Sequence, residues 1–227
     1  MHSPKILIPM AILLAPIGVS TAAASATPVL QTNQACYLVG QRVTITGSGF
    51  APSRMYRVAV DGINFGASTT DASGGFTASL LPGGLGQNVV QAVHTLSAND
   101  GTTLTNARFT VTRTTGARIL AGTGTAATLR APFQVWGFAL AAGKPVAYAL
   151  TGTRLPVYVH YLSPHKRLRA TIALGHTGGQ CGYLRTTARH VFPFIPSRGR
   201  WTLQVDSERA YSPHPGGPVA RIPVTVS

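Results

Sequence analysis

One basic segment of the chain carries the residue types that bind anions. Its cations follow a candidate strand over residues 156–162 and lead into another over residues 168–174; they are His165, Lys166, Arg167 and Arg169. Arginine can make paired hydrogen bonds to phosphate or carboxylate, and clustered cations attract an anionic partner from solution. The pattern predicts a hairpin whose tip binds a polyanion. The alternative is a solvated tip without a partner, because water and salt screen the repulsion between like charges.

Further arginines would extend this basic patch if their strands lie beside the hairpin. They are Arg185, Arg189, Arg198 and Arg200. The partners expected for such a patch are an anionic cell-wall polymer or another surface protein. Nearby tyrosines could stack on nucleic-acid bases, but the chain has no nucleic-acid-binding motif, so nucleic acid is not an expected partner.

Residues that could catalyse a reaction are scarce. The chain has only five acidic residues, and none is paired as the carboxylates of a glycosidase are. The sequence Gly47-Ser48-Gly49 lacks the Gly-x-Ser-x-Gly pattern of a nucleophile elbow. The histidines between residues 160 and 190 do not have zinc-finger spacing, and no Cys-x-x-Cys is present. We therefore expect no enzyme activity, no metal and no cofactor, and a hydrolase is the least expected function.

The positive charge is concentrated in the second half. The formal net charge is +14, from 19 Lys and Arg against 5 Asp and Glu. Residues 27–114 hold five arginines against three acids, and residues 115–227 hold eleven arginines and two lysines against two acids. This asymmetry predicts two modules, of which the second faces an acidic partner. The excess of arginine over lysine is also what the codon bias of a GC-rich genome produces, so composition leaves both explanations open.

The first 26 residues have the layout of a secretory signal peptide. A basic start at Lys5 precedes an apolar run over residues 6–19, and Ala24-Ser25-Ala26 has the small-x-small pattern of a cleavage site. The run is shorter than the roughly 20 residues that span a bilayer. We expect cleavage after Ala26, no transmembrane segment, and a soluble protein secreted into the extracellular space.

The two cysteines, Cys36 and Cys181, lie in different halves of the chain. In an exported protein they could form one disulfide, which would pin the halves together. Two buried free thiols are the alternative. The sequence favours free thiols, because each cysteine also suits a strand inside its own half.

Short strands separated by turn residues recur along the first half. Seven candidate strands lie between Ala35 and Thr112, and Asp-Gly or Gly-rich turns separate them. The stretch Val43 to Pro52 alternates apolar and polar residues and then bends at Gly47, Gly49 and Phe50. Because no helical period is present, the sequence predicts an all-β, immunoglobulin-like (Ig-like) sandwich.

Four stretches of this half carry a resemblance to a known group of modules. They are residues 36–41, 43–52, 60–62 and 70–76, which read CYLVGQ, VTITGSGFAP, VDG and TDASGGF. Together, over about residues 35–113, they resemble the Ig-like repeats of exported bacterial proteins, near the IPT/TIG and bacterial Ig-like families. The resemblance implies an Ig-like fold and a role as a spacer, an adhesive unit or an added domain, and it implies no catalytic residues.

The second half repeats the pattern weakly. Residues 135–139 echo the opening strand and its Gly-Phe corner, and further strand candidates include residues 145–150 and Val191–Ile195. We therefore predict a signal peptide over residues 1–26, an Ig-like β-sandwich over 27–114 and a second, basic Ig-like β-sandwich over 115–227. The expected function is that of a non-catalytic exported protein acting as an extracellular binding or structural unit; the alternative is a polyanion binder that acts through the second sandwich.

Overall fold

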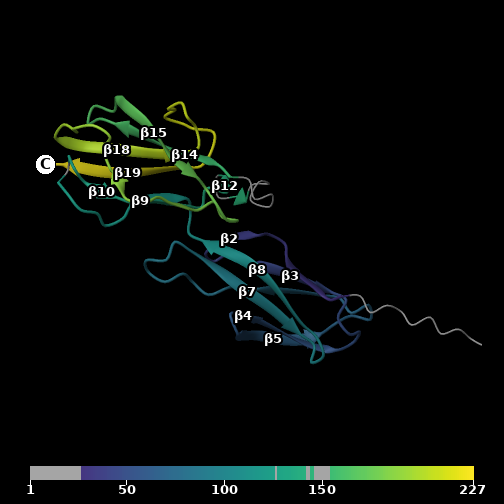
Figure 1. Ribbon diagram of the computed structural model, residues 1–227. Helices are drawn as coiled ribbons and strands as arrows, with labels where there is room; N and C mark the ends of the chain where they lie inside the picture. The colour runs from purple at the N-terminus through teal and green to yellow at the C-terminus, as the bar shows by residue number, and fades with distance from the viewer. Residues whose placement is uncertain (1–26, 126, 142–143, 146–153) are drawn as a thin grey trace, which may run out of the picture.

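The protein folds entirely as β-structure. The computed structural model describes residues 27–125, 127–141, 144–145 and 154–227. Strands β1–β8 pair only with one another, and so do strands β9–β19. Figure 1 shows these two groups as separate sandwiches, with the C-terminus at an end of the second that points away from the first. Within the described residues, no helix is long and apolar enough to cross a membrane.

The first sandwich has the strand order of an Ig-like fold. One sheet has the order β1-β3-β6 and the other β2-β8-β7-β4-β5, in which β2 runs parallel to β8 and the other pairs are antiparallel. The core lies between the two sheets, and every strand except β5, whose residues are all exposed, supplies residues to it. The strands are β1 (Val29–Thr32), β2 (Cys36–Leu38), β3 (Val43–Ser48), β4 (Met55–Val60), β5 (Ile63–Thr69), β6 (Phe76–Leu80), β7 (Gln91–Asn99) and β8 (Leu104–Thr112).

The corner after β3 fastens two other turns of this sandwich. Phe50 is buried, and its amide donates to the carbonyl of Gly74 at 3.1 Å. Gly74 has φ +78°, and a Cβ there would overlap the Phe50 carbonyl, so a side chain is excluded at this position. The buried Asp100 accepts hydrogen bonds from the amide of Ala51 at 3.0 Å and from the hydroxyl of Thr102 at 2.7 Å. These bonds hold the pKa of the Asp100 carboxyl far below its usual value.

The second sandwich is built on a four-stranded antiparallel sheet of order β15-β14-β18-β19. A smaller sheet, β16-β11-β9, and the pair β10-β17 pack against its inner face around a second core. Alternate residues face this core, such as Val159 paired with Val205 and Tyr161 paired with Leu203. The strands are β9 (Gly116–Ile119), β10 (Arg130–Ala131), β11 (Phe133–Trp136), β12 (Leu140–Ala141), β13 (Lys144–Pro145), β14 (Pro156–Leu162), β15 (Leu168–His176), β16 (Leu184–Arg185), β17 (Arg189–His190), β18 (Gly199–Asp206) and β19 (Val219–Val226).

The strand predicted over Val191–Ile195 is wrong. The paired residues are Arg189 and His190 in β17, and residues 191–198 form a bent segment instead. Two prolines in this segment, Pro193 and Pro196, have no amide to donate to a neighbouring strand. Most of the strand predicted over residues 145–150 lies outside the described residues.

The structure contains the disulfide between Cys36 and Cys181, so the expectation of two free thiols is wrong. The two Cα atoms lie 5.2 Å apart, and the bond links β2 of the first sandwich to the loop that follows β15 in the second. Both cysteines are buried with Leu140 in a small cluster of their own, against which Leu38 packs. Each cysteine does lie within its own half of the chain, but both lie where the two halves meet. The strand pattern of the sequence does not indicate that the two cysteines are close together.

Candidate anion-binding site

The basic hairpin forms as the sequence predicts, between β14 and β15. Its turn is closed by the amide of Lys166, which donates to the carbonyl of Ser163 at 2.7 Å, and by the amide of Ser163, which donates to the carbonyl of Arg167 at 2.9 Å. Lys166 has φ +58°, a left-handed conformation that costs a residue with a side chain about 1–2 kcal/mol. The turn geometry therefore does not explain why a lysine occupies this position.

Cations from two segments gather at this end of the second sandwich. The first pair of β18 and β19, Gly199 with Val226, lies at the same end as the tip of the β14–β15 hairpin, because β14 pairs with both β15 and β18. A Cβ on Gly199 would lie 2.7 Å from the ring of Pro164 in the turn, so the segments are in direct contact. We call the exposed cations gathered here the basic end; they are His165, Lys166, Arg167, Arg169, Arg198 and Arg200.

Two surface hollows adjoin at this turn, since Ser163 and Pro164 line both. The larger, of about 450 Å³, lies between Lys166 and Arg200 and continues to Arg221 on β19. The smaller hollow, of about 290 Å³, is lined by three basic and three apolar side chains, among other residues. Its lining includes His165, Arg167, Arg169, Phe194, Ile195 and Trp201.

Two of the predicted site residues do not reach the basic end. Arg185 lies on β16 opposite Gln134, in the smaller sheet. Arg189 lies on β17, and its guanidinium donates to the carbonyl of Ala173 on β15 at 3.0 Å. Of the four arginines proposed to extend the patch, the structure brings Arg200 into a hollow with Lys166 of the hairpin tip. Arg198 is at the same end of the sandwich but lines a separate hollow with Pro196, Val226 and Ser227, and Arg185 and Arg189 lie elsewhere.

No acidic side chain balances the basic end. In the part of the chain that the structure describes, its six cations form no salt bridge and no side-chain hydrogen bond. The nearest acids along β18 and beyond are Asp206 and Glu208, and six residues of extended strand place Asp206 about 20 Å from Arg200. These cations are free to bind an anionic partner without first breaking an internal ion pair.

Two residues that contribute to this site were not predicted from the sequence. Arg221 was not singled out, because its strand is distant in sequence; its guanidinium lines the larger hollow and also donates to the carbonyl of Pro213 at 2.9 Å. Ile195 was assigned to the end of a strand, but it lies on the bent segment and is 88% exposed. The prolines at positions 193 and 196 were the signal that could have revealed it.

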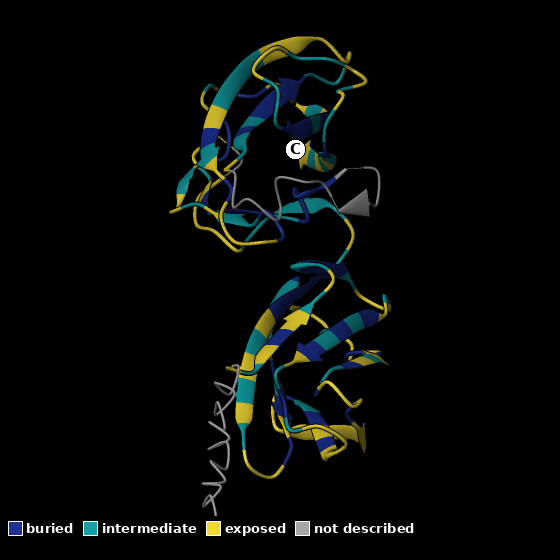
Figure 2. Ribbon diagram, turned by 90° about the vertical axis from the view of Figure 1, so that its right-hand side faces the viewer, coloured by how far each residue is buried: buried dark blue, intermediate teal, exposed yellow. Residues whose placement is uncertain are grey.

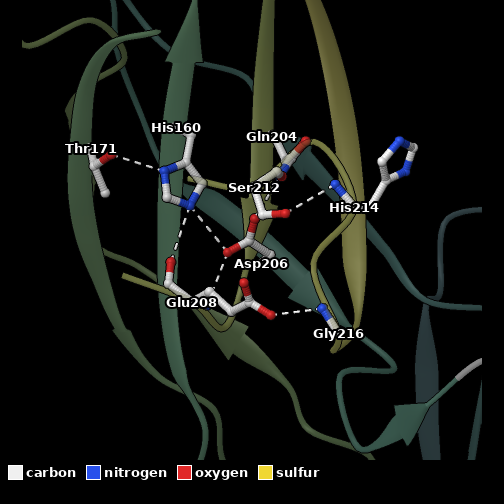
Figure 3. A network of polar contacts seen from close by, with 8 residues as sticks. All are labelled: His160, Thr171, Gln204, Asp206, Glu208, Ser212, His214 and Gly216. Carbon is white, nitrogen blue, oxygen red and sulfur yellow. Dashed lines mark hydrogen bonds and ion pairs between the residues drawn. The ribbon is translucent and has the colours of Figure 1, made fainter. Parts of the chain in front are cut away.

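The outer face of the same sheet carries a buried polar cluster that runs from the His160–Thr171 pair in the β14–β15 hairpin to Asp206 at the end of β18. Its side chains point outward from the sheet, but residues 207–218, between β18 and β19, fold back and cover them (Figure 3). His160, Gln204 and Asp206 have no exposed surface. The buried cluster consists of His160, Thr171, Gln204, Asp206, Glu208 and Ser212.

Hydrogen bonds account for nearly all polar atoms of this cluster. His160 Nε2 lies 3.1 Å from Asp206 Oδ1 and 3.1 Å from the carbonyl oxygen of Glu208. Both are acceptors, so Nε2 carries a proton. The other ring nitrogen, Nδ1, lies 2.8 Å from the Thr171 hydroxyl. Asp206 also accepts from Gln204 Nε2 at 2.8 Å and from the amide of Glu208 at 2.9 Å.

These contacts hold the covering segment to the sheet. The Gln204 amide donates to the carbonyl of Ser212 at 2.7 Å, and the ring of Tyr211 packs against His160 with centroids 5.6 Å apart. The His160–Asp206 pair resembles two members of a catalytic triad, but both residues are fully buried. Its contacts explain it as an anchor. Among the described residues, no group of three or more His, Cys, Asp or Glu side chains is placed to hold a metal ion.

Comparison with known proteins identifies no family. No family model and no curated protein matches the chain. Solved structures of similar shape include a Salmonella alpha-2-macroglobulin reacted with methylamine (14% identity, 89% of this chain and 14% of that chain, TM-score 0.32). Others are red sea bream transglutaminase (12%, 90% and 32%, TM-score 0.29) and the human OSCAR ligand-binding domain (8%, 90% and 100%, TM-score 0.32). These similarities are too low to support an argument about function.

Proposed function

We propose that this chain is an exported, non-catalytic Ig-like protein that binds an anionic polymer through the basic end of its second sandwich. The observation that carries the proposal is the gathering of six exposed basic residues, five of them Lys or Arg, from two segments at an end where the described structure places no acidic side chain. A cell-wall polymer or an acidic glycan has the repeated negative charge that such a surface attracts.

The local structure of the turn supports a binding role. At Lys166 the left-handed backbone would suit glycine better than lysine. Residues held in an unfavourable conformation occur preferentially where their side chains are used. Arg169 and Arg200 stand on strands of a sheet with a well-packed core, so their backbone positions are fixed before a ligand arrives.

Two features support export. The first 26 residues have the sequence pattern of a cleaved leader, and the Cys36–Cys181 disulfide is of a kind that persists in oxidising compartments. The resemblance of residues 35–113 to bacterial Ig-like repeats is consistent with a spacer or adhesive role for the first sandwich, with the specific contact made by the second.

A direct test is salt-dependent binding to heparin and to purified anionic wall polymer. The protein should bind both at low ionic strength and lose affinity as salt screens the contact. The triple variant Arg167→Gln, Arg169→Gln and Arg200→Gln should lose at least about tenfold in affinity, which corresponds to about 1.4 kcal/mol.

The control is a variant with the same change in net charge in the first sandwich. Arg54→Gln, Arg57→Gln and Arg108→Gln remove three exposed arginines there, and this variant should bind like the wild type. Equal losses in the two variants would mean that net charge, and not the basic end, governs binding. If the wild type bound neither polymer, the protein would be a structural unit without this function.

A further inference from the structure

Resting on the proposed function, we infer that the basic end docks on an anionic lipid bilayer, with Ile195 entering the headgroup region. The basic end binds the negative charge of the lipid, and the protruding aliphatic side chain distinguishes a bilayer from a polymer in solution. A soluble glycan offers charge but no apolar layer in which such a side chain could be buried.

Ile195 is the most exposed large hydrophobic residue of the described chain. It is 88% exposed, whereas the other large hydrophobic residues that lie at the surface range from 41% to 68%. Its side chain contributes to the same hollow as His165, Arg167 and Arg169. Leu168, between two of these cations in sequence, is 44% exposed. Two aliphatic side chains therefore lie within the group of cations.

The segment that presents Ile195 is held rigidly from below. Trp201 is buried, and its indole nitrogen donates to the carbonyl of Ser197 at 2.8 Å. The rings of Phe194 and Trp201 lie 5.4 Å apart, and Phe192 packs against both. Anchored residues on each side fix the backbone at Ile195, so its exposure is built into the fold.

Charge and position both favour a membrane surface. Anionic headgroups attract basic residues held near the surface, and a single aliphatic contact adds affinity that salt does not screen. The basic end lies beside the end of β19, where Val226 pairs with Gly199. In Figure 1 the C-terminus marks this end at the left of the second sandwich, whereas the first sandwich lies below and to the right. A flat bilayer can therefore approach it without meeting the first sandwich.

The test is co-sedimentation of the full secreted chain with lipid vesicles. One vesicle preparation contains phosphatidylcholine alone, and the other an equal mixture of phosphatidylcholine and phosphatidylglycerol. The protein should bind the mixed vesicles and not the neutral ones. Ile195→Ser should lower the affinity for mixed vesicles about tenfold, by removing the buried aliphatic group, and should leave heparin affinity unchanged. Ile63→Ser, at an aliphatic residue of the first sandwich that is 68% exposed, is the matched control and should bind both partners like the wild type.

The outcomes separate this inference from the proposed function. Heparin binding without vesicle binding, or full vesicle binding by Ile195→Ser, would overturn the inference and leave polymer binding intact. Equal binding to neutral and mixed vesicles would also overturn it. Failure of the wild type to bind heparin, wall polymer and vesicles alike would overturn the proposed function itself.

Discussion

In the second sandwich, the two acids lie away from the basic end: Asp206 is the last residue of β18 and Glu208 follows it, whereas Arg200 is the second residue of that strand. Under the segment that follows β18, Asp206 and His160 are buried and hydrogen-bonded, and Glu208 accepts from the amide of Gly216 at 2.7 Å. The six cations of the basic end are exposed and without partners in the described structure. The acidic groups form hydrogen bonds within the fold, and the basic groups remain available to bind a partner.

This difference follows from solvation. A polar group that is buried without a partner destabilises the fold, and in the buried cluster Gln204 Oε1 is the one buried side-chain atom that the described structure leaves without a partner. Exposed like charges on a hairpin cost little, because water screens them. Substitutions in the buried cluster should therefore lower the stability of the fold and leave binding unchanged. Substitutions at the basic end should weaken binding and leave stability unchanged.

The largest loss of stability is expected when the disulfide between the two sandwiches is removed. Replacing Cys36 and Cys181 together by serine frees a loop closed between residues 145 apart in sequence, which should lower the free energy of unfolding by up to about 5 kcal/mol. Denaturant unfolding measures the loss, and reduced wild-type protein is the control. Binding to heparin should persist under conditions where the variant is folded. An unchanged unfolding midpoint would mean that the bond does not constrain the chain.

Asp206→Ala should have the next largest effect. It removes an acceptor from the Glu208 amide and from Gln204, and each donor left buried without a partner costs about 1–3 kcal/mol. Glu208→Gln is the matched control, since the glutamine carbonyl can still accept from Gly216; its stability should stay within about 0.5 kcal/mol of the wild type. Heparin affinity should be the same in both. A stable Asp206→Ala protein would contradict the anchoring role.

The buried acid of the first sandwich should make stability depend on pH. Because folding lowers the pKa of Asp100, its contribution is present above about pH 4, the unfolded value, and is lost as pH falls below it. Asp100→Asn should cost about 1–3 kcal/mol near neutrality, and the gap to the wild type should narrow below about pH 4. Chemical unfolding of both proteins across this range measures the gap. If the difference in unfolding free energy between the two proteins did not change with pH, the amides of this corner would not be stabilising the ionised carboxylate.

The smallest effect on stability, and of opposite sign, is expected at the basic end. Lys166→Gly relieves the left-handed backbone and should leave the free energy of unfolding unchanged or raise it by up to about 1 kcal/mol. The same change removes a cation and should weaken heparin binding. Lys166→Asn also tolerates this backbone conformation and separates the loss of charge from the gain in chain flexibility. Unchanged binding in both variants would remove Lys166 from the site.

Local pattern was sufficient to predict the strands of the first sandwich and the basic hairpin, but not the bent segment at residues 191–198. Val43 and Ile45 alternate with polar residues and are fully buried, and Asp61-Gly62 forms the predicted turn. Such features depend on neighbours in sequence. The tip of the β14–β15 hairpin was predictable for the same reason, since its cations are almost consecutive.

Features that depend on strand register could not be predicted. Asp206 meets His160 because Tyr158 pairs with Asp206 and His160 with Gln204 across β14 and β18, and nothing near either residue specifies that pairing. The cysteine pair depends in the same way on how the two sandwiches meet. The choice among the four extending arginines required the sheet order, which leaves Arg185 in the other sheet.

The central claim, that the basic end is the binding surface, is tested most directly by mapping amide chemical shifts by NMR during titration with a heparin oligosaccharide. We predict that the largest changes fall on residues 163–169 and 194–200, grow with ligand and are reversed by salt. Residues of the first sandwich and of the buried cluster should not respond. Changes spread evenly over the exposed arginines of both sandwiches, or concentrated around Arg54 and Arg57, would contradict the claim.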